Sequence, residues 1–206
     1  MARFPGTDGG IDMTNSSDTL EQRYEWVVDV MSSLAVTTIV KRVIALATLT
    51  MAVIATLQLG LGYAATSSLG LVLQWACMLF AFAATAWWWV TPWPLISAAF
   101  TFVIGADIAM FISISVANTP PAIWLASTAL FIEIGMFVGF FLGRWMLVSH
   151  VLLCTAFTTF IALWVVAVDG VDPLMAAFVW APIVVSISGF VLLLQFCAHW
   201  VRVEFD

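Results

Sequence analysis

Six apolar segments, each of about 20 or more residues, dominate this sequence and leave few folds open to it. They cover residues 43–65, 68–90, 95–116, 122–142, 145–168 and 174–198. A helix of about 20 residues crosses the hydrocarbon core of a bilayer, which is ~30 Å thick. The chain is 64% hydrophobic and only 9% charged, whereas soluble proteins carry about 25% charged residues. The pattern predicts an all-α integral membrane protein, with a six-helix bundle over residues 43–198.

Two shorter regions precede the first apolar segment. Residues 1–17 are rich in small and polar residues without a period, which predicts a flexible tail. Residues 18–42 open with Asp18 and Glu21, a helix-start pattern, and then repeat apolar residues at intervals of three and four. We expect an amphipathic cytoplasmic or interfacial helix there. Its acids, Glu25 among them, favour docking on the bundle over docking on anionic lipid.

The basic residues predict the orientation of the helices. If the six segments alternate in direction, all six Lys and Arg side chains fall on one side of the membrane: Arg3, Arg23, Lys41, Arg42, Arg144 and Arg202. The acidic loop 169–173 falls on the other side. Because basic flanks stay in the cytoplasm, we expect a multi-pass protein of the cell membrane with both termini cytoplasmic. Residues 199–206 would then start a cytoplasmic signalling helix or form a C-terminal tail.

An aromatic run ends the second apolar segment on the predicted cytoplasmic side. It consists of Trp87, Trp88 and Trp89, with Trp93 in the turn that follows. Tryptophan is enriched at membrane–water interfaces, where its ring anchors a helix. We expect these residues to be interfacial anchors; the alternative is a cation–π cage for a ligand.

Charge, cysteines and motifs exclude several classes of function. The formal net charge is −6, but half of the acids precede the first apolar segment, so the sequence shows no nucleic-acid footprint. No phosphate-binding loop, nucleophile elbow or zinc motif occurs, which predicts that these residues form neither an enzyme active site nor a cofactor site. Cys77, Cys154 and Cys197 lie in three different segments and are expected to be packing thiols.

Two acids, Asp107 and Glu133, lie near the middle of the third and fourth apolar segments. In an antiparallel hairpin with a rise of ~1.5 Å per residue, both lie about 15 to 18 Å from the same face of the membrane. A charged side chain there costs roughly 2.5 to 3.5 kcal/mol, so an acid at this depth indicates a functional site. The two could share a proton, bind a cation or carry protons. Alternatively, both are protonated and lock the hairpin through hydrogen bonds.

Three glycines at intervals of four, Gly135, Gly139 and Gly143, form a ridge of small residues on the fourth segment. Such a ridge lets another helix approach closely, either in a dimer or inside one chain. Arg144 and His150 are the predicted supporting residues of the acid pair. His150 and His199 could ligate haem or a metal, but we found no carboxylate or cysteine at ligand spacing from either. We therefore expect no metal, and expect His150 to be a hydrogen-bonded bundle residue near Arg144.

Several features together resemble a known family of signalling proteins. They are Tyr24-Glu25-Trp26, Arg42, the turn Trp93-Pro94, the run Gly139-Phe140-Phe141-Leu142-Gly143-Arg144, and an exit through Gln195, His199 and Arg202 to Val203-Glu204-Phe205-Asp206. The chain resembles the N-terminal six-span sensor region of actinobacterial, mycobacterial-type GGDEF proteins, which are similar to diguanylate cyclases of cyclic di-GMP signalling. The resemblance implies a GGDEF domain after the sixth span. The sequence ends at Asp206, so the family's catalytic residues have no positions here and no cyclase activity is expected of this chain.

These features predict a membrane sensor or anchor module, dimeric in the bilayer, that passes a stimulus to a cytoplasmic GGDEF domain or partner protein. Two alternatives stay open from the sequence. One is a small proton- or cation-coupled transporter, although the two halves show no repeat. The other is an accessory subunit that packs into a larger membrane complex through its glycine ridge.

Overall fold

The computed structural model describes residues 14–33 and 35–205, and every regular element in those residues is helical. The helices, in chain order, are α1 (Thr14–Ser33), α2 (Thr37–Gly60), α3 (Ser68–Val90), α4 (Ile96–Val116), α5 (Pro121–Ser127), the 3₁₀ turn η1 (Thr128–Leu130), α6 (Phe131–Phe141), α7 (Arg144–Ala167) and α8 (Pro173–Phe205). The all-α class is therefore confirmed.

Five helical stretches are long and apolar enough to cross a membrane. They are Thr37–Gly60, Ser68–Val90, Ile96–Val116, Pro121–Phe141 and Trp145–Ala167. The stretch that starts at Pro121 includes α5, η1 and α6, which follow one another without a break. Among the described residues, α8 contributes a shorter apolar stretch, Pro173–Gly189. A membrane protein is thus supported, whereas the count of six spans stays a prediction.

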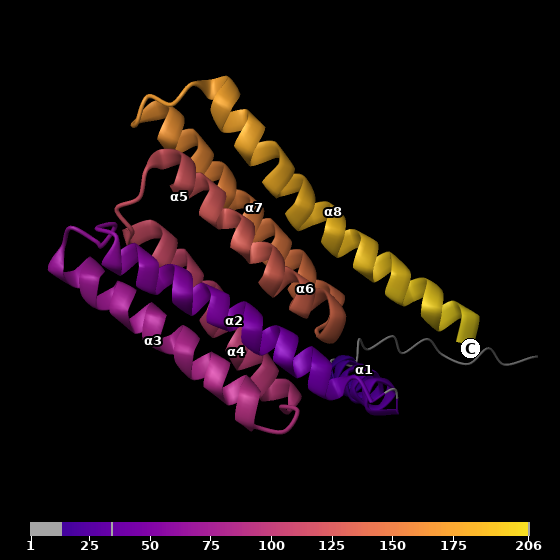
Figure 1. Cartoon of the computed structure of the whole chain (residues 1–206). Coiled ribbons are helices and arrows are strands. Elements are labelled where there is room, and N and C mark those ends of the chain that lie inside the picture. Colours follow the sequence, from indigo (N-terminus) through magenta and orange to yellow (C-terminus); the bar gives the residue numbers. More distant parts are fainter. Residues whose placement is uncertain (1–13, 34, 206) are drawn as a thin grey trace, which may run out of the picture.

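The helices form two sets that lie side by side (Figure 1). In the first set α2 packs along α3, and α3 along α4. In the second set α5, α6 and α7 pack against α8, and α6 also packs against α7. Contact between α4 and α6 joins the two sets. The arrangement of the two sets relative to each other therefore depends on the residues that lie between them.

Proline and glycine residues mark several ends of these helices. Pro121 starts α5 at a position where its missing N–H costs no hydrogen bond. Gly62 and Gly170 take positive φ values of 86° and 68° in the loops after α2 and α7. Glycine reaches this conformation without steric cost. At the start of α3, Ser67 Oγ accepts a hydrogen bond of 3.0 Å from the backbone N–H of Gly70.

The helix predicted over residues 18–42 is interrupted, and the region begins to be helical earlier, at Thr14. Ala35 adopts a left-handed conformation with φ 55°. Its backbone N–H donates to Ser32 O at 3.0 Å, and that of Val36 donates to Met31 O at 3.0 Å, which is the Schellman arrangement of a helix end. Glycine or asparagine usually occupies this position, so an alanine in the sequence does not predict a helix end.

Helix α1 docks on the turn between α3 and α4. Tyr24 is buried, its hydroxyl donates to Pro94 O at 2.7 Å, and it accepts a hydrogen bond from Trp93 Nε1 at 2.9 Å. Met31, two turns along α1, is buried as well. These contacts attach α1 to protein, as the acidic residues of this helix led us to expect.

Trp88 forms the centre of an aromatic cluster rather than an interfacial anchor. Its side chain is fully buried, and its ring centroid lies 5.1 Å from that of Trp87, 5.7 Å from Trp93, 5.4 Å from Phe102 and 5.6 Å from Phe137. These residues come from α3, α4, α6 and the turn after α3, so the cluster joins the two helix sets.

The neighbouring Trp89 does face outward, with 58% of its surface exposed. The guanidinium of Arg42 lies 5.9 Å from its ring centroid, a cation–π distance. The interfacial position predicted for the aromatic run therefore fits Trp89 but not Trp88.

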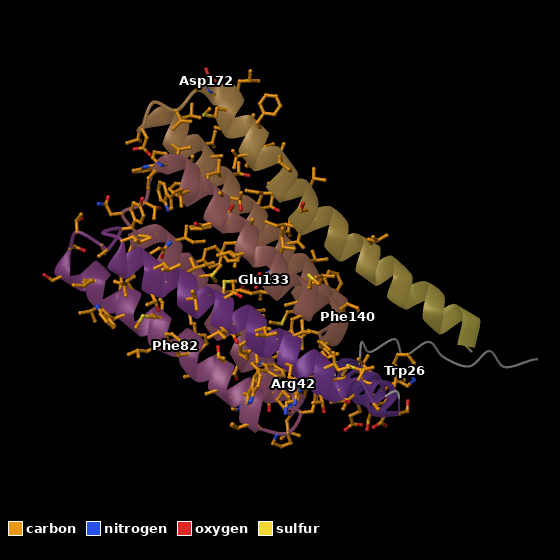
Figure 2. The ribbon with its side chains drawn as sticks, in the orientation of Figure 1. Trp26, Arg42, Phe82, Glu133, Phe140 and Asp172 are labelled. Atoms are coloured by element: carbon orange, nitrogen blue, oxygen red, sulfur yellow. The ribbon has the colours of Figure 1, made fainter. Side chains whose placement is uncertain are left out.

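Helix α8 extends beyond the other helices at the end of the bundle where α1 lies (Figure 1). Its 33 residues span ~50 Å at a rise of ~1.5 Å per residue, well beyond a ~30 Å hydrocarbon core. Figure 2 places Arg42 and Trp26 near this end and Asp172 at the opposite end. Arg42 and Asp172 thus lie at opposite ends of the bundle.

We expect Trp88→Ala to destabilise the fold by about 3 to 5 kcal/mol, since it empties a large, fully enclosed volume between the two sets. Trp89→Ala is the matched control and should cost under about 1 kcal/mol, because that ring is mostly exposed. The two variants are compared by thermal unfolding in the same detergent, monitored by circular dichroism. Equal losses of stability would contradict the central position of Trp88.

Burial raises the pKa of Tyr24 to about 12, and the hydrogen bond from Trp93 opposes this only partly. A raised pKa means that the folded state favours the neutral phenol. The resulting stabilisation is present below pH ~10, the ordinary value, and is lost as the pH rises through about 12. We expect tyrosinate absorption in a Tyr63→Phe variant to titrate near that value. An ordinary titration near pH 10 would contradict the docked position of Tyr24.

Candidate functional site

The acid on α4, Asp107, pairs with a histidine on α7. Its Oδ2 lies 3.0 Å from Nδ1 of His150. The side chains are 14% and 2% exposed, respectively. An unpaired polar group in hydrocarbon costs several kcal/mol, so each residue stabilises the other at this depth. This contact links the first helix set to the second.

The second ring nitrogen of His150 fixes how the ring is oriented. Nε2 lies 3.2 Å from the carbonyl oxygen of Phe131, at the start of α6. A carbonyl only accepts, so Nε2 carries a hydrogen and donates. Nδ1 then faces Asp107, and a contact of 3.0 Å between two acceptors would be repulsive without a cation between them. One proton or metal ion must therefore lie between Nδ1 and Oδ2.

A thiol completes the group. Cys154 lies one turn after His150 on α7, is fully buried, and places Sγ 3.8 Å from Nδ1 and 3.6 Å from Nε2. One ligand atom each from Asp107, His150 and Cys154 fall within 4.8 Å of one another. We call these three residues the Asp–His–Cys cluster. Carboxylate, imidazole and thiolate are all ligands of zinc-like metals.

Glu133 lies away from this cluster, in a pocket between the two helix sets. The pocket has a volume of about 580 Å³ and is lined by residues of α2, α3, α4 and α6. Among the residues that the structure describes, Glu133 is the only acidic or basic one that lines the pocket, and its Oε2 is buried without a hydrogen-bond partner. Figure 2 shows Glu133 near the middle of the bundle's length. We call this cavity the Glu133 pocket.

The two predicted acids therefore have different surroundings. Asp107 pairs with His150, whereas Glu133 lines the pocket, and no hydrogen bond joins the two carboxyl groups among the described residues. His150 supports Asp107 directly, as the sequence suggested, but the described part of the structure shows no role for Glu133 in that pair. The side chain of Arg144 lies outside the description, as do those of His199 and Cys197.

The glycine ridge lies inside the single chain. Gly135, Gly139 and Gly143 are all buried, and α6 packs against α4, α7 and α8. Of the two uses left open by the sequence, the structure shows the internal one. Small residues here let neighbouring helices approach α6 closely.

Cys154 is the site residue that sequence reasoning missed. It follows His150 by four residues, and side chains at this spacing share one face of a helix. The expectation that no cysteine lies at ligand spacing from a histidine is wrong for this pair. Sequence spacing could not identify Asp107 as a partner of His150, because the two residues meet only through the packing of α4 against the second set.

We expect a double-mutant cycle of Asp107→Leu and His150→Leu to show a coupling free energy of about 1 to 2 kcal/mol, since either single change leaves a buried polar partner unpaired. Unfolding by denaturant in mixed micelles gives the free energy of unfolding of the wild type, the two single variants and the double variant. Pairing Asp107→Leu with Thr158→Val is the control. Thr158 is buried two turns further along α7 and donates a hydrogen bond to the carbonyl of Cys154 in its own helix, so those effects should add. Additive effects for Asp107 and His150 would contradict their pairing.

Comparison of the chain with models of protein families, with curated proteins and with solved structures finds no match. Its function is therefore inferred from the Asp–His–Cys cluster and the Glu133 pocket.

Proposed function

We propose that this protein is a membrane sensor module of six spans, which binds an amphiphilic molecule in the Glu133 pocket and passes the change in helix packing out through α8. The observation that carries the proposal is the position of the pocket. Residues of α2, α3 and α4 line it from the first helix set, and residues of α6 line it from the second.

A ligand in this pocket touches both helix sets at once. It can therefore favour one arrangement of the sets over another, which is the physical requirement of a sensor. Contact between α4 and α6 is less extensive than the packing of α2 on α3 or of α7 on α8, so we infer that the arrangement of the helices changes at the boundary between the sets. The pocket's volume of about 580 Å³ falls in the ~300 to 1,000 Å³ range of small-molecule sites.

The lining defines the chemistry of the ligand. Most side chains that face the pocket are aliphatic or aromatic, which suits a hydrocarbon tail. Glu133 Oε2, buried and without a partner, suits a head group that donates hydrogen bonds or carries a positive charge. We therefore propose a lipid-soluble amine or a similar amphiphile that enters from the bilayer.

Helix α6 connects the pocket to the output. Glu133 and Phe137 of α6 line the pocket, and α6 also packs against α8. Helix α8 in turn continues past the other helices. A shift of α6 upon binding would reach the far end of α8 directly.

The resemblance to GGDEF sensor regions fits this direction of signalling. A cytoplasmic GGDEF domain or partner protein after α8 is the proposed output. The separation of the Arg42 end from the Asp172 end supports an orientation with both termini in the cytoplasm of the cell.

We expect dodecylamine to bind the wild-type protein in nanodiscs at least tenfold more tightly than Glu133→Gln, because the variant loses the carboxylate that pairs with the amine. Hydrogen exchange of α8 should change when dodecylamine binds the wild type. Asp169→Asn is the control, since it removes one acid from an exposed loop and should bind normally.

Dodecanoate, which has a similar tail and an acidic head group, should bind poorly. Equal binding of both probes, or equal binding by wild type and Glu133→Gln, would contradict the proposed ligand chemistry. Tight binding without any change of exchange in α8 would contradict the sensor function itself.

A further inference from the structure

We propose that Asp107, His150 and Cys154 form an intramembrane binding site for one divalent transition-metal ion of the zinc class. This proposal concerns α4 and α7 and does not depend on the ligand of the Glu133 pocket. The ligand atoms of the three residues already lie within 4.8 Å of one another. Three protein ligands with one open position are a common zinc arrangement.

The distances within the cluster are close to those of a metal site. Tetrahedral bonds of ~2.0 to 2.3 Å place neighbouring ligand atoms about 3.3 to 3.7 Å apart. The structure has 3.0 Å between His150 Nδ1 and Asp107 Oδ2, and 3.8 Å between Nδ1 and Cys154 Sγ. These two distances are within a few tenths of an ångström of the tetrahedral values, and all three ligand atoms lie within 4.8 Å of one another.

The orientation of His150 is the one that a metal ligand needs. Nε2–H donates to Phe131 O at 3.2 Å, so the lone pair of the neutral ring lies on Nδ1, which faces Asp107 Oδ2 at 3.0 Å. Metal-ligating histidines nearly always donate their second N–H to a carbonyl or a carboxylate in this way. The backbone of α6 thus holds the ring in place.

A second oxygen of the cluster is without a partner. Asp107 Oδ1 is buried and makes no hydrogen bond. A buried, unpartnered carboxylate oxygen costs free energy that a cation would recover. The hydrogen bond between Asp107 and His150 leaves this atom without a partner, and a metal ion bound by both carboxylate oxygens would provide one.

Charge balance favours a divalent ion at this depth. An ionised Asp107, a Cys154 thiolate and a neutral His150 sum to two negative charges, which one divalent cation neutralises. The ion replaces two protons, one from the thiol and one held between Asp107 and His150. A neutral site avoids the cost of a net charge in hydrocarbon. Sulfur and nitrogen ligands together select zinc-like metals over magnesium or calcium.

Binding would tie α4 to α7. Asp107 belongs to the first helix set, and His150 and Cys154 belong to the second. Metal–ligand bonds would replace the hydrogen bond that now joins them. The ion would then hold the two sets in one arrangement.

The test uses the full chain in detergent micelles, cleared of metal by a chelator and titrated with Co²⁺. We expect one Co²⁺ per chain with near-ultraviolet thiolate absorption, which Zn²⁺ displaces. This needs no variant, so a wild-type protein that gives no thiolate absorption overturns the proposal.

Conservative variants identify the ligands, and circular dichroism and size-exclusion chromatography check their fold. Cys154→Ser should abolish the thiolate absorption and weaken Co²⁺ binding more than the roughly 10- to 100-fold typical of outer-shell changes. Asp107→Asn and His150→Gln should also weaken it. Cys77→Ser is the control, a buried cysteine outside the cluster, and should bind as the wild type does. Absorption that persists in Cys154→Ser, or disappears in Cys77→Ser, overturns the proposal.

Discussion

The hydrogen bond between Asp107 and His150 is the interaction on which the middle of this bundle depends. Hydrocarbon offers no partner for a carboxyl group, so the protein must provide one. Here that partner comes from the opposite helix set, and the carbonyl of Phe131 satisfies the other side of the imidazole. Three helices, α4, α6 and α7, are therefore positioned by one histidine.

Some polar side chains of the first helix set also have partners within the protein. Thr85 donates to Thr48 at 3.0 Å between α3 and α2, and Gln74 Oε1 accepts from the backbone N–H of Ala65 at 2.9 Å. Such contacts within one set fix its internal packing. Glu133 differs from the paired hydroxyls of Thr48 and Thr85, because its carboxyl group lines the pocket with Oε2 buried and unpartnered. This contrast is why we assign that pocket, rather than the polar contacts around it, to an external ligand.

Much of the architecture could be predicted from the sequence, because each bilayer span requires a long apolar run. The helix 68–90 has the predicted ends, and the two acids were recognised as site candidates from their depth alone. Their partners could not be found in this way. The approach of His150 to Asp107, the burial of Trp88 and the break at Ala35 all depend on packing or backbone geometry that hydropathy does not encode.

The unbroken course of α8 has a mechanical consequence. A helix of ~50 Å that pivots about its midpoint acts as a lever, and a tilt of about 5° displaces its tip by roughly 2 Å. The same tilt moves the helix by less than about 1 Å near the pivot, where α8 packs against its neighbours. A small tilt of α8 among its neighbouring helices thus becomes a larger displacement at its far end.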